Sequence, residues 1–254
     1  MKIRITLSLV LIILTGSAFS QIRRQDFTEI LQEYVLDGKV NYKQLCQDAR
    51  LTAYLQKLSR TNPDTIRSDA DRLAFWLNAY NAFTLKIICD NYPVKSINDL
   101  HFGGLVVGTI VNKTVWDKEF ITINGQAVSL NHIEHDIIRK AFKEPRAHFA
   151  LVCASISCPP LRSEAFEGFK LEQQLTDQGR VYLNNGRENR FDKERRIAYL
   201  SKILDWYAGD FGRNDAEVLL YVARFLPGEL ALDIKENIRK WKIKYTDYAW
   251  GLNE

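Results

Sequence analysis

The chain has 254 residues, of which 46% are hydrophobic and 26% are charged. These proportions predict a folded globular protein and exclude a disordered chain, and the length allows one large domain or two small ones. Lysine and arginine number 35 against 31 aspartate and glutamate, and this near balance argues against a dedicated nucleic-acid-binding protein.

The first twenty residues have the organisation of a secretory signal peptide. Lys2 and Arg4 precede an apolar run at positions 7–14, and small residues at positions 18 and 20 permit cleavage after Ser20. The run is shorter than the roughly 20 residues that cross a membrane. We therefore expect a mature chain of residues 21–254 that forms a single globular domain, is periplasmic or secreted, and has no stable membrane insertion.

Four cysteines, an even number, fit an exported protein that can form disulfides. Four thiols allow three pairings. Only four residues separate Cys153 from Cys158, so a local loop can join them, and a Cys153–Cys158 disulfide is one hypothesis. It competes with the alternative that one of the two is a free, reactive thiol.

The first half of the chain is predicted to be helical. Apolar residues recur at helical spacing over 27–35, and a second amphipathic helix is expected at 43–58. The next helix begins at Ser68-Asp69, where either side chain suits an N-cap, and runs to about residue 91. Its segment 73–85 carries no charge and is apolar on every side, which is typical of a buried helix.

The second half mixes strands and helices. Residues 120–128 predict a hairpin, because Asn124-Gly125 suits a tight two-residue turn. The other expected elements are strands at 148–152, 197–200 and 241–245, and helices at 130–142, 169–183, 203–207 and 216–226. This order indicates an α+β fold: a helix-rich single domain around a small, largely antiparallel sheet, with the buried helix at its centre.

Asn78 and Asn81 are the first candidate site residues. They lie three apart, so they share one face of the predicted buried helix. A buried amide without partners costs about 1–3 kcal/mol, so both must be hydrogen-bonded. One interpretation is a structural network that holds neighbouring loops. The other is a polar pocket in which they orient a ligand or a catalytic histidine.

The segment Asn131-His132-Ile133-Glu134-His135 is the second candidate. Asn131 is expected to cap a helix, with Glu134 at the third position of a capping box. His135 and Arg139 then share a helix face, four residues apart. The order H-x-E-H does not match the zinc-protease pattern, and the cysteines that follow do not have the spacing of a zinc deaminase. The sequence therefore predicts neither a metal nor a cofactor.

Residues 145–160 are the third candidate. A predicted strand leads into a loop rich in cysteine and serine, and such loops often carry sites. His148 is a candidate base, and Cys153 or Cys158 a candidate nucleophile. Residues five apart in a regular strand point to opposite faces, so His148 and Cys153 would meet only through a bulge or a turn. The alternative is a disulfide-closed loop beside a buried, hydrogen-bonded histidine.

Asp205 and Asp210 flank Trp206-Tyr207 and are weaker candidates for a pair of acids. Acids beside a helix end are more often caps or surface charges, and that interpretation is preferred for both.

Five stretches together resemble the family catalogued as domain of unknown function 547. They are 74–82 (AFWLNAYNA), 129–135 (SLNHIEH), 145–161, 204–211 and 248–253. The resemblance covers nearly the whole mature chain. It implies no activity, because the family's name records that none is established.

The family is in turn similar in fold to papain-like and transglutaminase-like thiol hydrolases. That similarity implies a cysteine at the N-terminal end of the central helix, a histidine on a following strand, and an aspartate or asparagine. Here His148 suits the histidine role, but the central helix offers Asn78 and Asn81 in place of cysteine. Cys89 lies at its C-terminal end, where the helix dipole does not favour a thiolate. Either Cys153 or Cys158 replaces the missing nucleophile, or catalysis has been lost.

Two functional hypotheses follow, and the sequence leaves open whether the chain is an enzyme. In the first, the protein is a non-catalytic envelope module that binds a peptide, a glycan or a partner protein. In the second, it is a thiol-dependent hydrolase or transferase in which His148 is the base, oriented by Glu134 or Asn78. The candidate ligand contacts are Asn81, His135, Arg139, Arg146 and Ser155.

Overall fold

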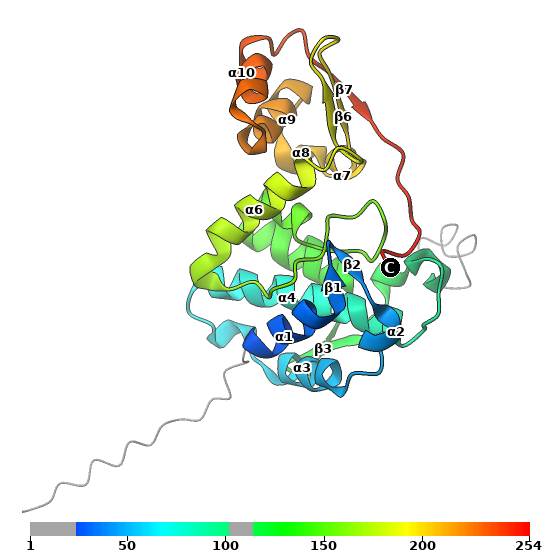
Figure 1. Ribbon diagram of the computed structural model, residues 1–254. Coiled ribbons are helices and arrows are strands. Elements are labelled where there is room, and N and C mark those ends of the chain that lie inside the picture. The colour runs from blue at the N-terminus through cyan, green and yellow to red at the C-terminus, as the bar shows by residue number, and fades with distance from the viewer. Residues whose placement is uncertain (1–23, 102–113) are drawn as a thin grey trace, which may run out of the picture.

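The computed structural model describes residues 24–101 and 114–254 (Figure 1). The predicted signal peptide at 1–20 lies outside these residues. The predicted helix-rich α+β class is confirmed, because helices dominate and the strands are short. None of the helices in the described part of the chain combines the length and the hydropathy that a membrane crossing requires.

The elements follow one another in this order. The α-helices are α1 Arg24–Tyr34, α2 Tyr42–Leu45, α3 Ala49–Arg60, α4 Asp69–Cys89, α6 Leu171–Leu183, α7 Ile203–Trp206, α8 Ala208–Phe211, α9 Asp215–Val222 and α10 Gly228–Glu236. A π-helix, η4, covers His132–Phe142, and short 3-10 turns are η1 Pro63–Thr65, η2 Ile97–Leu100, η3 Val115–Asp117, η5 Pro145–Phe149, η6 Gly168–Lys170 and η7 Ala223–Phe225. The strands are β1 Val35–Leu36, β2 Lys39–Val40, β3 Ile121–Ile123, β4 Gln126–Val128, β5 Arg190–Asp192, β6 Ile197–Leu200 and β7 Lys242–Tyr245.

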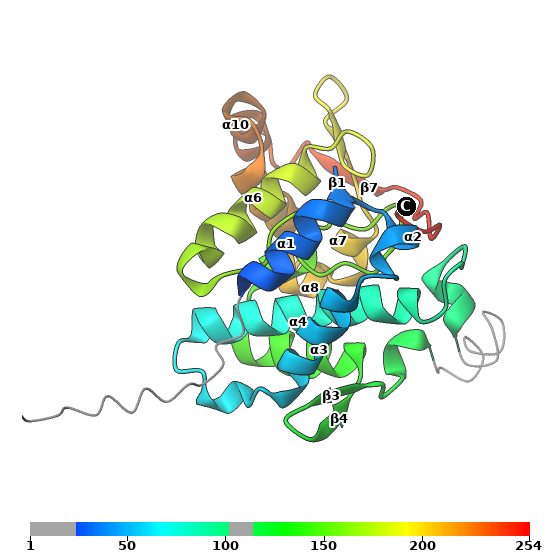
Figure 2. The same cartoon turned by 60° about the horizontal axis from the view of Figure 1, so that its bottom comes forward.

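Helix α4 is the buried central helix that the sequence predicts. The Ser68 side chain caps it by accepting a hydrogen bond from the Asp71 amide, and every residue from Leu73 to Leu85 is buried. Figure 2 shows α3 lying across α4, while η4 and η6 contact α4 as well. Because α4 is covered on several sides, its polar residues must find partners inside the protein.

The described residues build two hydrophobic cores. The larger surrounds α4 and takes in α1 to α3, the β3–β4 hairpin and η4. The smaller joins the end of α6 to α7–α10 and the sheet of β5, β6 and β7, which occupy the upper part of Figure 1. The chain between η5 and α6 therefore runs along the junction of the two cores.

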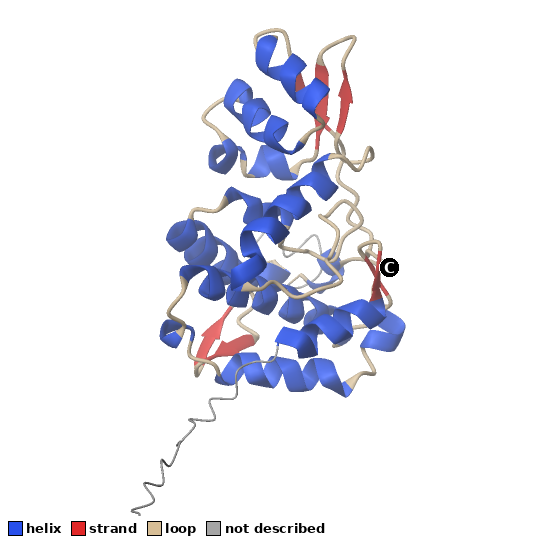
Figure 3. Ribbon diagram, turned by 60° about the vertical axis from the view of Figure 1, so that its left-hand side comes forward, coloured by secondary structure: helices blue, strands red, loops and turns tan. Residues whose placement is uncertain are grey.

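The sheets of the described region are small and lie apart from one another (Figure 3). Strands β3 and β4 form the predicted hairpin, in which Asn124 and Gly125 take the positive φ values of 50° and 77° that such a turn needs. Strand β6 pairs antiparallel with β5 and parallel with β7. The parallel pair forms because helices α7 to α10 intervene between β6 and β7.

Two predicted elements differ in the structure. The helix expected at 43–58 is divided into α2 and α3. Helix α2 ends at Leu45, and Asp48 starts α3 by accepting a hydrogen bond of 2.8 Å from the Arg50 amide. The strand expected at 148–152 is wrong. Pro145 and a Glu144 cap, which accepts from the Arg146 amide, start the 3-10 turn η5 there instead.

Candidate functional site

A cavity of about 250 Å³ lies where the two cores meet. We call it the aromatic cavity, because six rings line it: Tyr80, Trp116, Trp206, Tyr207, Tyr248 and Trp250. Glu134, His148, Cys153 and Cys158 line the same cavity. Four of the residues that the sequence singles out as catalytic candidates therefore face one space.

His148 is held by an acid at the junction of the two cores. Its Nε2 lies 2.7 Å from Oδ2 of Asp210, and its ring stacks on Tyr207 with 4.0 Å between the centroids. Arg139 donates to both carboxylate oxygens of Asp210, from Nε at 2.6 Å and from Nη2 at 2.9 Å. Burial opposes ionisation of Asp210, but these hydrogen bonds outweigh it and lower its pKa. Asp210 is therefore a carboxylate that fixes the imidazole.

The protonation of His148 follows from these surroundings. Burial of the ring lowers the pKa of His148, so the imidazole is neutral at pH 7. A carboxylate only accepts hydrogen bonds, so the proton sits on Nε2 and Nδ1 is left as the basic nitrogen. Nδ1 lies 3.8 Å from Oε1 of Glu134, which is too far for a direct hydrogen bond.

Glu134 is buried in η4 and does not form the predicted capping box. Asn131 occupies the N-cap position as predicted, but its side chain does not cap the helix. Ser129 accepts from the His132 amide at 3.0 Å, and the Asn131 side chain donates to Asp117 at 2.6 Å. Glu134 instead lies near Tyr207, whose pKa is raised first by burial and then by this carboxylate. Glu134 thus sits in the wall of the cavity between an imidazole and a phenol.

The Cys153 thiol has three hydrogen-bonding partners. Its Sγ lies 3.0 Å from Sγ of Cys158, 3.0 Å from Oγ of Ser155 and 3.1 Å from the Tyr248 hydroxyl. The hydrogen bond with Cys158 is the largest influence and lowers the pKa of Cys153 from near 9 to about 7, against the opposing effect of burial. Burial and the neighbouring Cys153 raise the pKa of Cys158. Near neutral pH, Cys153 is the thiolate of the pair and Cys158 keeps its proton.

A left-handed residue and the C-terminal tail shape the loop that carries the thiols. Ala154 has a φ of 57°, and this reverses the chain directly after Cys153. The loop then pairs with the tail, because the Ile156 amide donates to the Gly251 carbonyl at 2.8 Å and the Ala249 amide donates to Ser157 Oγ at 3.0 Å. The same tail delivers Tyr248 to Cys153, so residues about 95 positions apart build one cluster.

Asn78 and Asn81 act as structural clamps and do not line the cavity. Asn81 donates to the Ala150 carbonyl and accepts from the Val152 amide, both at 2.9 Å. Asn78 holds residue 166 in the same two-bonded way, at 2.9 and 2.8 Å. One N–H and the carbonyl oxygen of each amide bond to backbone groups, and neither residue lines the cavity. The geometry therefore gives no support to Asn78 as an orienting residue for His148 or to Asn81 as a ligand contact. Asn81 instead fixes the backbone that leads into Cys153.

Of the other predicted ligand contacts, some lie at the thiol cluster or behind the cavity wall, and one lies elsewhere. Ser155 joins the thiol cluster. Arg139 lies behind His148 and donates to His135 Nδ1 at 3.0 Å, so these two residues support the site from outside the cavity wall. Arg146 belongs elsewhere: it forms ion pairs of 2.6 Å with both Glu144 and Glu172, which fasten η5 to α6.

Asp210 and the aromatic wall are the residues that sequence reasoning missed. The sequence pattern favours a cap or a surface charge for Asp210, whereas in the structure Asp210 binds His148 and Arg139. Tyr248, Trp206 and Trp250 reach the cavity from chain segments far from the cysteines. The available signal was that 204–211 and 248–253 share the family resemblance with the cysteine loop, because no local pattern connects them.

The cysteine pairing differs from the hypothesis. Cys46, directly after α2, and Cys89, the last residue of α4, form the disulfide, with 43 residues of separation. Cys153 and Cys158 are free thiols in contact, so the predicted Cys153–Cys158 disulfide is wrong for this state of the protein.

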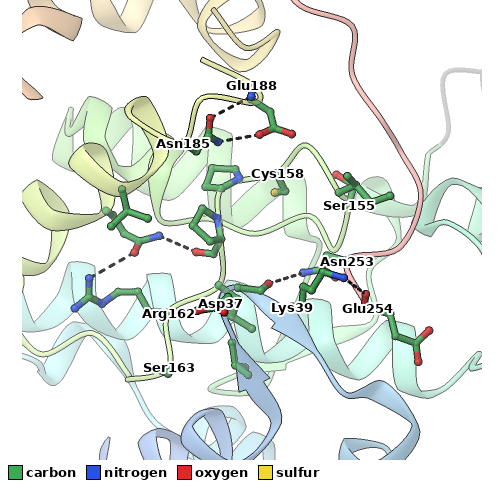
Figure 4. A pocket seen from close by; sticks show the side chains of 18 of the residues that line it. Asp37, Lys39, Ser155, Cys158, Arg162, Ser163, Asn185, Glu188, Asn253 and Glu254 are labelled. Carbon is green, nitrogen blue, oxygen red and sulfur yellow. Dashed lines mark hydrogen bonds between the residues drawn. The ribbon is translucent and has the colours of Figure 1, made fainter. Parts of the chain in front are cut away.

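A larger groove of about 890 Å³ shares Cys158 with the aromatic cavity (Figure 4). The β1–β2 hairpin, the 155–164 loop, α6 and the C-terminus line it. Its polar groups bond to one another: Lys39 donates to the Glu254 backbone carbonyl at 3.0 Å and Asn185 donates to Glu188 at 2.8 Å. Of the candidate catalytic residues, Cys158 is the one that lines this groove.

Comparison with known protein families finds a match over part of the chain. Residues 63–183 match the model described as "Protein of unknown function, DUF547". The match supports membership of the DUF547 family. The DUF547 segment contains α4, η4 and both free thiols, whereas Asp210 and Tyr248 lie beyond its end. No curated protein and no solved structure matches the chain.

Proposed function

We propose that this protein is a thiol-dependent hydrolase or transferase that binds its substrate in the aromatic cavity, with Cys153 as the nucleophile. The observation that carries the proposal is that the Cys153 thiol and the Asp210-bound His148 line the same cavity. A thiolate nucleophile and a basic nitrogen beside one bound molecule are what acyl transfer through a thioester requires.

The chemistry assigns a separate task to each group. The Cys153 thiolate attacks an acyl carbon, the bond to the leaving group breaks, and a thioester forms on Sγ. A proton from solvent goes to the leaving amine or alcohol. His148 Nδ1 then accepts a proton from water or an acceptor hydroxyl, which attacks the thioester and releases the Cys153 thiolate, and His148 returns that proton to solvent.

The proposed relationship to papain-like and transglutaminase-like thiol hydrolases rests on this combination of thiol, imidazole and acid. The arrangement differs from that pattern in one respect. The thiol comes from the loop after Val152, and its pKa is lowered mainly by hydrogen bonding with Cys158 and not by the start of a helix.

We further propose that the protein works outside the cytoplasm, periplasmic or secreted. The Cys46–Cys89 disulfide supports this location, since structural disulfides persist mainly in oxidising compartments.

The test combines alkylation with turnover. We expect iodoacetamide to label Cys153 at a rate that rises with pH, has its midpoint near pH 7 and then levels off, because the thiolate is the reactive form and its pKa is about 7. We expect p-nitrophenyl acetate to acylate Cys153, with an initial burst of nitrophenol, and Cys153→Ser to abolish both reactions. His148→Ala should retain alkylation and lose steady-state turnover, since both ring nitrogens face carboxylates and not the thiol.

His132→Ala is the matched control. His132 is an exposed histidine at the start of η4, bonded to Asp136 and outside the cavity, so turnover should stay at the wild-type level. Equal nitrophenol release by wild type and Cys153→Ser, or an alkylation midpoint near the ordinary thiol pKa of about 8.5, would contradict the proposal.

A non-catalytic module that binds a peptide, glycan or partner protein is the second candidate. The observation that favours it is the ring cluster at the cavity: Trp206 stacks on Trp250 with 5.8 Å between centroids and is 48% exposed. Exposed aromatic rings of this kind pack against sugar rings and apolar side chains. Protection of Cys153 from iodoacetamide by a ligand that is never turned over would favour this function.

A further inference from the structure

The two free thiols form a pair with unequal properties. Their sulfur atoms lie 3.0 Å apart, and the Cys153 amide donates to Sγ of Cys158 at 2.9 Å. The left-handed Ala154 and the hydrogen bonds to the C-terminal tail hold the two residues in this position. An acyl-transfer mechanism uses the Cys153 sulfur and gives Cys158 no covalent role.

Thiol–disulfide exchange needs a thiolate that attacks and a second thiol that resolves. Cys153 has the first property, since its thiolate is stabilised near neutral pH. Cys158 has the second, since it stays protonated while Cys153 is a thiolate. The second and third causes of this high pKa are the hydrogen bond to Cys153 and the Cys153 charge. Both disappear once Cys153 is bonded to another sulfur, so Cys158 then ionises more readily.

Small molecules can reach the pair from the aromatic cavity, and Cys158 also borders the groove. Cys153 and Cys158 both line the cavity, and Cys158, Ser155 and Pro160 line the groove, where Figure 4 shows the Cys158 sulfur beside the open space. The cavity volume of about 250 Å³ admits a small disulfide or the end of a larger one.

We propose that Cys153 and Cys158 form a redox-active dithiol site that reduces small disulfides by thiol–disulfide exchange. This activity uses the same sulfur as the proposed acyl transfer but requires no acyl chemistry and no His148. It also assigns a covalent role to Cys158, which the hydrolase chemistry does not.

The exchange has two steps. The Cys153 thiolate attacks one sulfur of the substrate R–S–S–R′, the S–S bond breaks, and R′–S⁻ leaves with Cys153 in a mixed disulfide. Cys158 gives its proton to R′–S⁻ and attacks Sγ of Cys153, which releases the second thiol and closes a Cys153–Cys158 disulfide. The pair loses two electrons and the Cys158 proton, a second proton comes from solvent, and the substrate leaves as two thiols. An external thiol reductant restores the pair.

The test uses the full chain and oxidised glutathione as the probe. We expect the wild type to lose both free thiols, to release reduced glutathione and to show a Cys153–Cys158 cross-link in peptide mass spectra. Cys158→Ser should stop at the first step and accumulate glutathione on Cys153. Cys153→Ser should give neither product at pH 7. Treatment with excess dithiothreitol should restore both thiols in the wild type.

Separate glutathione adducts on both cysteines of the wild type, or both thiols still free after incubation, would overturn the inference. Failure of Cys158→Ser to trap the mixed disulfide, in a variant whose circular dichroism matches the wild type, would do the same. The nitrophenol assay separates the two proposals. Acylation without exchange removes only the dithiol inference, and exchange without acylation removes only the hydrolase proposal.

Discussion

The two cysteine pairs of this protein consist of the same side chains but lie in different surroundings. Cys46 and Cys89 are half-buried at the ends of α2 and α4, where they pack against the larger core and are joined in a disulfide. Cys153 and Cys158 lie at the junction of the two cores, where a serine and a tyrosine hydroxyl surround the sulfur of Cys153. The first pair closes a 43-residue segment, while the second faces a cavity. Hydrogen bonding to the sulfur therefore distinguishes a reactive pair from a structural one.

The largest expected effect concerns the structural pair. Replacing Cys46 and Cys89 together by serine should lower the free energy of unfolding by about 4 kcal/mol, which is the loop-closure value for a segment of this length. Denaturant titration followed by circular dichroism measures this loss. The alkylation rate of Cys153 in the folded variant should be unchanged. If that rate falls as well, the two pairs are coupled and the comparison fails.

The next effect tests what holds the reactive loop. Asn81→Ala removes two buried hydrogen bonds and leaves the Ala150 carbonyl and the Val152 amide without partners. The expected loss is about 3 kcal/mol in the free energy of unfolding. Asn91→Ala is the matched control, because Asn91 is exposed and bonds only to the Ile87 carbonyl one turn earlier. Its cost should stay within about 0.5 kcal/mol, and equal losses for the two variants would show that the clamp is unimportant.

The smallest effect concerns the support of the imidazole. Asp210→Asn removes the charge that orders His148 and Arg139, and the loss of a charged hydrogen bond of about 2 kcal/mol should reduce p-nitrophenyl acetate turnover about 30-fold. Cys153 alkylation should change little, since the carboxylate does not contact the thiol. Asp205→Asn, which loses only a surface pair with Lys202, should keep wild-type turnover. Normal turnover in Asp210→Asn would remove the imidazole from the mechanism.

Sequence reasoning succeeded where a signal is local. The uncharged segment 73–85 identified the buried helix, and Asn124-Gly125 identified the hairpin, because each depends on neighbours within a few residues. It failed at 148–152, where apolar residues suggested a strand. There the backbone hydrogen bonds go to Asn81, a side chain about 70 positions earlier, and no periodic pattern reports such a partner.

The candidate site shows the same contrast between local sequence signals and long-range contacts. His148, Glu134, Cys153 and Cys158 were found from their residue types and spacing, and they do line one cavity. Asp210 is not predicted from the sequence, because an acid near a helix end is usually a cap. Its contact with the His148 imidazole is visible only in the folded protein. Cysteine pairing was likewise open, since four thiols permit three pairings and only their positions in space select one.

The amino-acid sequence by itself determined the helix-rich class, the central helix and the set of chemically active side chains, because these depend on composition and short-range periodicity. The tertiary structure alone decided which cysteines are bonded, which acid binds the imidazole and which rings enclose the thiol. Those choices depend on contacts between residues 43 to 95 positions apart. Such contacts are fixed by the packing of the two cores and leave no local trace in the chain.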